Sequence, residues 1–349
     1  MQLLNTLYLT TPDTYLRLEN QTLAVEQDQA LKLRVPLQHL SAVVCFGHIQ
    51  LSTPLMHTLA QQGIALVLLD ANGRFQARLE GPMAGNVLLR QAQHRAVSDA
   101  GQSLSLARSF VAGKIRNARS LLLRGAREAR TEQDAADLTR QAQNLAASLR
   151  ALPGCESLDA VRGTEGEAAR QHFAGLSLLV RPDAREHFSM QDGRSRRPPR
   201  DRLNALLSFL YSLWMNDCRS ALEAVGLDPQ LGFLHALRPG RAALALDLME
   251  EFRPQAERLA MTLINRQQLR ADDFIEREGG AISLQADARK GVLIAYQERK
   301  QETLQHALLA QPVALGLVPL IQARLLARTV RGEVDADNQS AAYVPFLIK

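Results

Sequence analysis

The first eighty residues alternate apolar and polar positions over short runs, a pattern typical of β-strands. Strands are predicted at 3–10, 15–19, 22–26, 31–35 and 41–46. A closing hairpin is predicted from 64–69 and 74–79, joined by the turn residues Asp70-Ala71-Asn72-Gly73. One helix interrupts these strands, with Thr53 as its N-cap, Pro54 in its first turn and its end at Gly63.

From Gly85 onward the apolar residues recur every three or four positions, which is the period of an amphipathic helix. The longest stripe comprises Leu104, Ala107, Val111, Ile115, Ala118 and Leu122. A second helix is predicted at 203–222, and further helical segments lie near 256–270, 288–309 and 315–330. We therefore predict an α+β protein with a small N-terminal β-rich domain at 1–84 and a larger all-α domain at 85–349.

Composition excludes several classes of protein. The chain of 349 residues has no run of eighteen apolar residues and no signal-peptide pattern at its start, so we expect a cytoplasmic protein without membrane spans. Cys45, Cys155 and Cys218 show no CxxC spacing, which favours reduced thiols over disulfides or a zinc site. Motifs for dinucleotide binding, for a P-loop and for a nucleophile elbow are missing as well.

Positive charge is concentrated in one segment of a chain whose net charge is +5. Residues 188–201 combine the prolines Pro198 and Pro199 with Arg194, Arg196 and Arg197, so a helix is not expected there. One interpretation is a solvated connector. The other is a strap that binds phosphates, since every neutralised phosphate releases counterions.

Glu165 is the first candidate for chemistry. It lies in a helical pattern between Gly163 and Gly166, each of which costs roughly 1 kcal/mol relative to alanine. Because these two glycines weaken the helix, their presence suggests that another group approaches the backbone closely there. The alternative is ordinary helix packing with Glu165 on the solvated face.

His235 and an acidic pair are the other candidates. His235 follows the turn-rich segment 226–234, where a histidine can be a ligand or a structural residue. Asp247 and Glu250 are three residues apart, so on a helix both carboxylates share one face and require a nearby cation. The alternative is that Asp247 is the N-cap of a helix. Carboxylates with one imidazole and no cysteine form a set that suits Mg²⁺ or Mn²⁺.

At these residues the chain resembles the CRISPR-associated integrases that acquire new spacers, specifically the form that accompanies type I-C systems. The resemblance covers essentially the whole chain. It is carried by Leu4-Asn5-Thr6-Leu7-Tyr8, Asn72-Gly73-Arg74-Phe75, Gly85-Asn86-Val87-Leu88-Leu89-Arg90, Gly113-Lys114-Ile115 with Asn117, Gly163-Thr164-Glu165-Gly166-Glu167-Ala168-Ala169, Gly193-Arg194-Ser195-Arg196-Arg197-Pro198-Pro199, Asn204-Ala205-Leu206-Leu207-Ser208, Gly226-Leu227-Asp228-Pro229, Gly232-Phe233-Leu234-His235 and Leu246-Asp247-Leu248-Met249-Glu250-Glu251-Phe252-Arg253-Pro254.

The resemblance implies a site and a reaction. Glu165, His235 and Glu250 would be the metal ligands, with Asp247 beside them as an auxiliary acid. The 3′-hydroxyl of a prespacer DNA would attack a phosphodiester at the CRISPR repeat boundary, and water in its place would give endonuclease activity.

The resemblance also implies partners. A homodimer would form through the N-terminal β-domain, and a small ferredoxin-like protein would bridge two dimers around a DNA duplex. Candidate contacts to the DNA backbone are Arg194, Arg196, Arg197, Arg241, Arg299 and Lys300. Ala236 and Leu237 depart from the polar residues expected after His235.

Two other functions are alternatives to that of an integrase. One is a non-catalytic DNA-binding scaffold, and the other is a metallohydrolase of small phosphoesters.

Overall fold

The computed structural model describes residues 6–40, 42–70, 75–79, 81, 87–190, 193–195, 198–309, 311–333 and 342–348. The chain divides into two compact units. Within the described ranges, no helix has the length and apolar character needed to cross a membrane.

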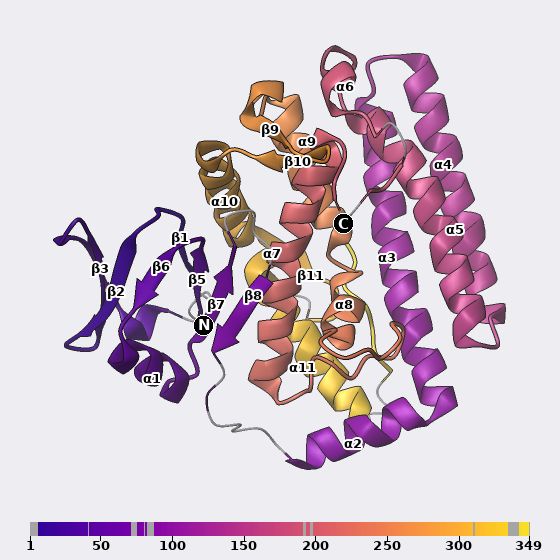
Figure 1. Ribbon diagram of the computed structural model, residues 1–349. Coiled ribbons are helices and arrows are strands. Elements are labelled where there is room, and N and C mark those ends of the chain that lie inside the picture. Colours follow the sequence, from indigo (N-terminus) through magenta and orange to yellow (C-terminus); the bar gives the residue numbers. More distant parts are fainter. Residues whose placement is uncertain are drawn as a thin grey trace. The chain divides into compact units, whose positions relative to one another are not determined.

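The first unit consists of Met1–Ala84 together with Leu284–Glu302 and Ala314–Leu317. It contains two four-stranded sheets (Figure 1). One sheet has the order β4-β3-β2-β6, formed by Ala30–Pro36, Thr22–Gln27, Thr14–Glu19 and Ile49–Leu51. The other has the order β1-β5-β7-β8, formed by Thr6–Leu9, Ala42–Phe46, Ala65–Leu69 and Phe75–Leu79. The β-rich character predicted for this part of the chain is confirmed.

Helix α1 (Thr53–Gln61) buries Leu55 and Leu59 in the core of the first unit. Its N-cap is Ser52, whose hydroxyl accepts a hydrogen bond from the Leu55 N–H, so the prediction of Thr53 as the cap is wrong by one residue. Strands β7 and β8 pair antiparallel as the predicted hairpin requires. The turn residues 71–73 lie outside the described residues.

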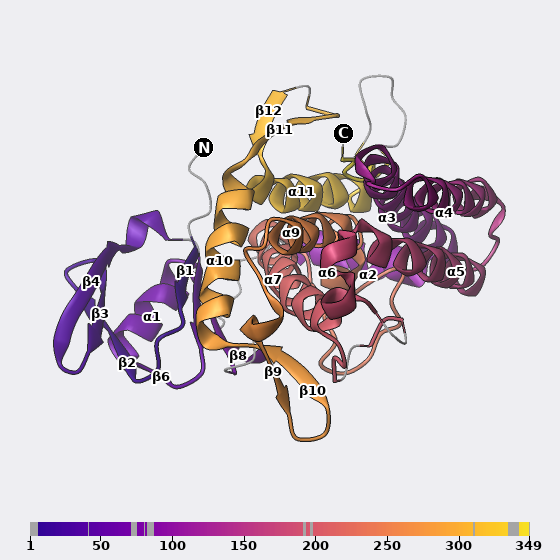
Figure 2. The same ribbon diagram turned by 90° about the horizontal axis from the view of Figure 1, so that it is seen from above.

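The second unit consists of Gly85–Ser283, Thr303–Val313 and Val318–Lys349, and it is mainly helical. Helices α3 (Ala100–Glu128), α4 (Glu132–Ala151) and α5 (Leu158–Leu176) lie side by side around a core that includes Val111, Leu138 and Val161 (Figures 1 and 2). Helix α7 (Arg202–Val225) packs against α8 (Ala243–Met249), α9 (Arg253–Asn265) and α11 (Val318–Val330). Shorter helices are α2 (Val87–Ser98) and α6 (Pro182–Phe188).

Two features of the region after residue 85 differ from the prediction. The region is not all-α, because it holds the strand pairs β9–β10 (Phe274–Arg277 and Ala281–Leu284) and β11–β12 (Thr303–His306 and Gln311–Ala314). In addition, helix α10 (Ala286–Gln301) belongs to the first unit, so that unit is discontinuous in sequence.

Candidate functional site

A cluster of charged side chains lies in the second unit, where four helices and one loop meet. Lys114 comes from the middle of α3, Glu165 from α5 and His235 from the loop after α7. Glu250 ends α8, and Arg253 begins α9. Two cations that the sequence did not single out, Lys114 and Arg253, therefore contact the predicted glutamates.

Lys114 connects the two predicted glutamates. Its ammonium group forms ion pairs with Glu165 Oε1 and with Glu250 Oε2, the latter at 2.7 Å. The Lys114 side chain is 11% exposed, whereas those of Glu165 and Glu250 are 27% and 3% exposed. The cluster thus reaches solvent on the Glu165 side and is closed on the Glu250 side.

The ring of His235 lies between Asp247 and Glu250. Its Nδ1 atom is 2.6 Å from Asp247 Oδ1, and its Nε2 atom is 3.9 Å from Glu250 Oε1. The Asp247 carboxylate accepts a hydrogen bond from Nδ1–H, which fixes the ring so that Nε2 faces Glu250. The imidazole therefore has one ring nitrogen fixed by Asp247 and the other facing the charged cluster, with 21% of the side chain exposed.

Asp247 is fully buried and fixes the loop that carries His235. Its carboxylate accepts hydrogen bonds from the backbone N–H groups of Phe233, Leu234 and His235, at 2.6 Å, 3.0 Å and 3.0 Å. The N-cap alternative is wrong, because Asp247 lies near the end of α8 and Ala242 occupies the N-cap. A side chain on Gly232 would meet Ala243 and Asp247 Oδ2 within 2.8 Å, so glycine permits this docking.

Glu250 is a buried carboxylate whose negative charge is retained. Burial alone would raise its pKa, but the positive charges of Arg253 and Lys114 outweigh burial and hold the pKa well below its usual range. Arg253 contributes two contacts to Glu250 Oε1, at 2.8 Å and 2.9 Å. The repulsion expected between Asp247 and Glu250 is thus offset by an imidazole on one side and two cations on the other.

The backbone around Glu250 is anchored by the C-terminal segment 342–348. The carboxylate of Glu251 accepts hydrogen bonds from the Tyr343 hydroxyl, the Phe346 N–H and the Gln322 amide. Burial raises the pKa of Glu251 to about 8. Asn117, one turn beyond Lys114 on α3, donates to the carbonyl groups of Glu251 and Phe346 at 2.9 Å.

A second buried network adjoins Arg253. Its guanidinium lies over the Tyr211 ring, 4.8 Å from the centroid, and the Tyr211 hydroxyl donates to Glu257 at 2.6 Å. Glu257 also contacts His172 Nε2 at 2.7 Å. This network fixes Arg253, which in turn holds Glu250.

The donor atoms fit a hard divalent cation, although they do not form a closed ligand set as they stand. In the part of the chain that the structure describes, no three His, Cys, Asp or Glu side chains converge closely enough to hold a metal ion. The Lys114 ammonium instead occupies the position between the carboxylates of Glu165 and Glu250. Glu250 Oε2 is buried and ion-paired without a hydrogen bond of normal geometry, so this oxygen remains suited to a metal.

The glycines beside Glu165 border open space. A Cβ atom built on Gly163 or Gly166 would meet nothing within 4 Å in the described structure apart from its own helix. Packing among the described residues therefore does not explain the two helix-weakening glycines.

The predicted DNA contacts fall into different environments. Arg194 is held internally by Asn204 at 2.7 Å and by Ser208 at 3.0 Å. Arg241 is half-buried, and Arg196 and Arg197 lie outside the described residues.

Arg299 and Lys300 belong to the first unit, and neither presents an open cation. Lys300 is 4% exposed and places its ammonium 5.4 Å from the Tyr296 ring centroid, while Arg299 pairs with Glu302. Burial of Lys300 argues against the DNA contact predicted there.

Comparison of the sequence with known families and proteins gives consistent matches. Residues 7–298 match the model of the family described as CRISPR associated protein Cas1. A CRISPR-associated endonuclease Cas1 from Moorella thermoacetica is 53% identical over 348 residues, with 99% of each chain covered. Another, from Rhodospirillum rubrum, is 50% identical and covers 96% of this chain and 97% of its own length.

Solved structures share the fold. The structure of a Cas6-RT-Cas1–Cas2 complex matches 99% of this chain and 37% of its own, with a TM-score of 0.81 at 24% identity. A casposase bound to an integration product matches 95% of this chain and 92% of its own, with a TM-score of 0.81 at 20% identity. At these identities the likeness establishes the fold alone.

Proposed function

The chain belongs to the Cas1 family of CRISPR-associated proteins, and on that basis we propose that it is a divalent-metal-dependent DNA endonuclease and integrase. It would insert short DNA fragments into a CRISPR array. The observation that carries the proposal is that Glu165 and Glu250 meet at the Lys114 ammonium while His235 Nε2 lies 3.9 Å from Glu250 Oε1. The high identity to relatives named as endonucleases along their whole length supports the same activity.

Glu165, His235 and Glu250 would hold a Mg²⁺ or Mn²⁺ ion, with Asp247 as the positioning acid behind the imidazole. Carboxylate oxygens with one imidazole suit these ions, and the imidazole shifts the preference toward Mn²⁺. Binding would displace the ammonium of Lys114 from between the two carboxylates. Lys114 would then be available to a neighbouring phosphate.

The reaction we propose is a transesterification. The 3′-oxygen of the incoming DNA forms a bond to phosphorus, and the bond from phosphorus to the 3′-oxygen of the target strand breaks. The attacking hydroxyl loses its proton, and the leaving 3′-oxygen takes up a proton to become a free hydroxyl. A bound divalent ion would lower the pKa of the attacking hydroxyl and stabilise charge on the phosphate oxygens. Lys114 and Arg253 add positive charge beside Glu250, and Asp247 keeps the Nε2 lone pair of His235 directed into the site.

The partners are proposed from the family. We propose a homodimer formed through the N-terminal β-domain, bridged by a small ferredoxin-like protein equivalent to the Cas2 component named in the neighbouring complex. The bound DNA would be the prespacer duplex and the CRISPR repeat, contacted by Arg194, Arg196, Arg197 and Arg241. We also propose that the chain belongs to a type I-C system.

A joining assay tests this function. The protein, its small partner, a short duplex and a repeat-bearing plasmid are incubated with Mn²⁺, and covalently joined product is scored. Glu165→Gln should abolish joining, whereas Glu167→Gln, an exposed carboxylate on the same helix, should leave it intact. DNA binding without any Mn²⁺-dependent product from the wild type would indicate a non-catalytic scaffold instead.

A further inference from the structure

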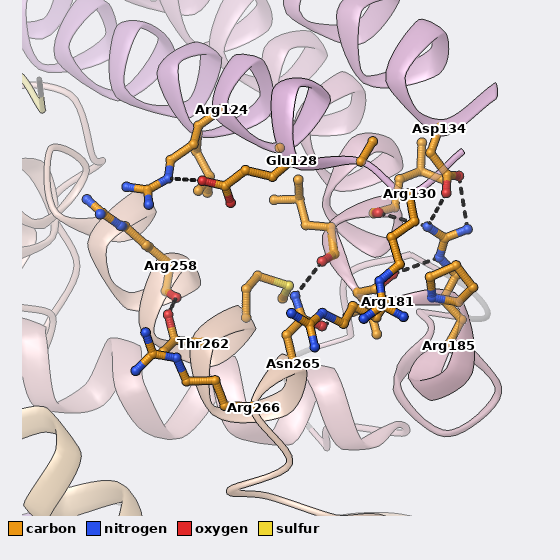
Figure 3. Close-up of a pocket in the computed structure, with 18 residues that line it drawn as sticks. Arg124, Glu128, Arg130, Asp134, Arg181, Arg185, Arg258, Thr262, Asn265 and Arg266 are labelled. Atoms are coloured by element: carbon orange, nitrogen blue, oxygen red, sulfur yellow. Dashed lines mark hydrogen bonds and ion pairs between the residues drawn. The ribbon is translucent and has the colours of Figure 1, made fainter. Parts of the chain in front are cut away.

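A cavity of about 330 Å³ lies in the second unit, away from the carboxylate cluster (Figure 3). It is bounded by the last turns of α3, by the segment 178–185 and by the end of α9. None of Lys114, Glu165, His235, Asp247 and Glu250 lines it. The cavity is therefore a site distinct from the one described above.

The lining of this cavity is strongly positive. It includes six arginines, Arg124, Arg130, Arg181, Arg185, Arg258 and Arg266, and only two carboxylates, Glu128 and Asp134. The lining thus carries an excess of four positive charges, in a chain whose net charge is +5. Such a concentration in one concavity focuses the field and favours an anionic ligand.

Part of the cavity wall is built by fixed polar contacts. Arg185 is held by both oxygens of Asp134, at 3.0 Å and 2.8 Å, and donates to the carbonyl groups of Val180 and Leu178. The Asn265 amide donates to the Leu179 carbonyl at 2.8 Å. The side-chain oxygen of Asn265 accepts from the backbone N–H of Arg181 at 2.9 Å. This wall is shaped before any ligand arrives.

Other arginines at the rim remain available to a ligand. Arg181 and Arg266 are exposed, and neither has an ion-pair partner among the residues that the structure describes. Among the described residues, the ion pair of Arg124 is with the exposed carboxylate of Glu128, which water screens. Figure 3 shows Arg124, Arg258 and Arg266 around one side of the hollow and Arg130, Arg181 and Arg185 around the other.

We propose that this arginine pocket binds a backbone phosphate of the DNA on which the cluster acts, an inference that rests on the proposed function. Guanidinium groups bind phosphate oxygens in pairs and with defined geometry, which suits a pocket of several arginines. The same two helices serve both sites: Lys114 and Gly125 lie on α3, and Arg253 and Asn265 lie on α9.

The spacing of the two sites fits one bound strand. Eleven residues separate Lys114 from Gly125 on α3, which corresponds to about 16 Å at the rise of an α-helix. One strand of a B-form duplex advances about 3.4 Å per nucleotide along its axis, so a phosphate held in the pocket would belong to a different nucleotide from the reacting phosphate. It would fix the register of the DNA without contacting the bond that breaks.

The salt dependence of DNA binding tests the proposal. The double variant Arg181→Ala/Arg266→Ala is compared with Arg150→Ala/Arg324→Ala, which removes the same charge from exposed arginines outside the pocket. Loss of two phosphate contacts should flatten the slope of log K against log salt by about 1.8 for duplex and about 1.4 for single-stranded DNA. The control should retain the wild-type slope and should cleave saturating DNA with Mn²⁺ at the wild-type rate.

A second arm identifies the source of the phosphate. Wild-type protein is titrated calorimetrically with a 5′-phosphorylated dinucleotide and, separately, with inorganic phosphate. Dinucleotide binding that is lost in Arg181→Ala/Arg266→Ala supports the proposal, and binding of inorganic phosphate alone overturns it. An unchanged salt slope in the pocket variant also overturns it. Absence of cleavage by the wild type would instead reject the proposed function and leave the slope comparison valid.

Discussion

The ammonium group of Lys114 lies 2.7 Å from Oε2 of Glu250 and also contacts Glu165, so a lysine stands where the proposed divalent ion would bind. Two carboxylates that approach each other this closely require a cation between them. The structure supplies that cation from α3. Metal binding and the Lys114 ion pairs are therefore expected to compete.

This competition predicts the behaviour of Lys114→Gln. Without metal, the free energy of unfolding should fall by about 3 kcal/mol, because Glu250 is left buried with fewer positive neighbours. Adding Mn²⁺ should raise the melting temperature of this variant more than that of the wild type, since no ammonium has to be displaced. Lys290→Gln, an exposed lysine, provides the control. An equal Mn²⁺ response in wild type and Lys114→Gln would show that the ion binds elsewhere.

Asp247→Asn tests the positioning of the imidazole. The asparagine amide carries no negative charge, so it holds the Nδ1–H group of His235 less strongly than the carboxylate does. The ring therefore loses its defined tautomer and orientation. Mn²⁺-dependent cleavage should fall by about 10- to 100-fold while the circular dichroism spectrum of the folded protein is retained. Cleavage at the wild-type rate would show that the reaction does not require Asp247 to position His235.

Gly113→Ala tests the anchoring of the C-terminal segment. The added Cβ would lie 2.6 Å from Pro345 Cβ and 3.2 Å from Glu251 Cγ, so the segment has to shift. We expect a loss of about 1–3 kcal/mol in the free energy of unfolding, measured by denaturant titration. Gly163→Ala is the matched control, because its Cβ meets no other group and should add about 0.4–1 kcal/mol of stability. Similar effects of the two substitutions would contradict the close packing at Gly113.

His306 gives a pH-dependent prediction. Burial lowers the pKa of His306 below its ordinary value of 6.5, and its neutral Nδ1 accepts the Leu309 N–H. A group with a lowered folded-state pKa binds more protons when unfolded, so its stabilising contribution is present above pH 6.5 and is lost as pH falls below that value. Between pH 7 and pH 5, His306→Gln should therefore lose less unfolding free energy than the wild type, as measured by urea titration. Parallel losses in the two proteins would exclude this role.

The sequence predicted the elements with a regular apolar period. The long stripe ending at Leu122 is α3, and the alternation at 15–19 and 22–26 corresponds to β2 and β3. Strand β6 has only three residues, too few for alternation to register. The strands β9 to β12 have four residues each and follow or interrupt helical patterns, so the region was wrongly predicted as all-α.

The site was only partly accessible to sequence reasoning. Asp247 and Glu250 are three residues apart, so their proximity follows from spacing, but the contact of Glu165 with Lys114 spans 51 positions. The contact of Glu251 with Phe346 spans 95. Lys114 was not identified because a lysine on an amphipathic helix has the same pattern as an ordinary solvated residue. From the sequence, only the resemblance to a known family indicates that Glu165, His235 and Glu250 act together.

The most direct test of the account is the binding of Mn²⁺ itself, followed by electron paramagnetic resonance during titration of the protein. The wild type should bind the ion at a defined stoichiometry, and Glu165→Gln, Glu250→Gln and His235→Ala should each weaken that binding strongly. His187→Ala, an exposed histidine outside the cluster, should bind as the wild type does. Unchanged Mn²⁺ affinity and stoichiometry in all three cluster variants would contradict the central claim.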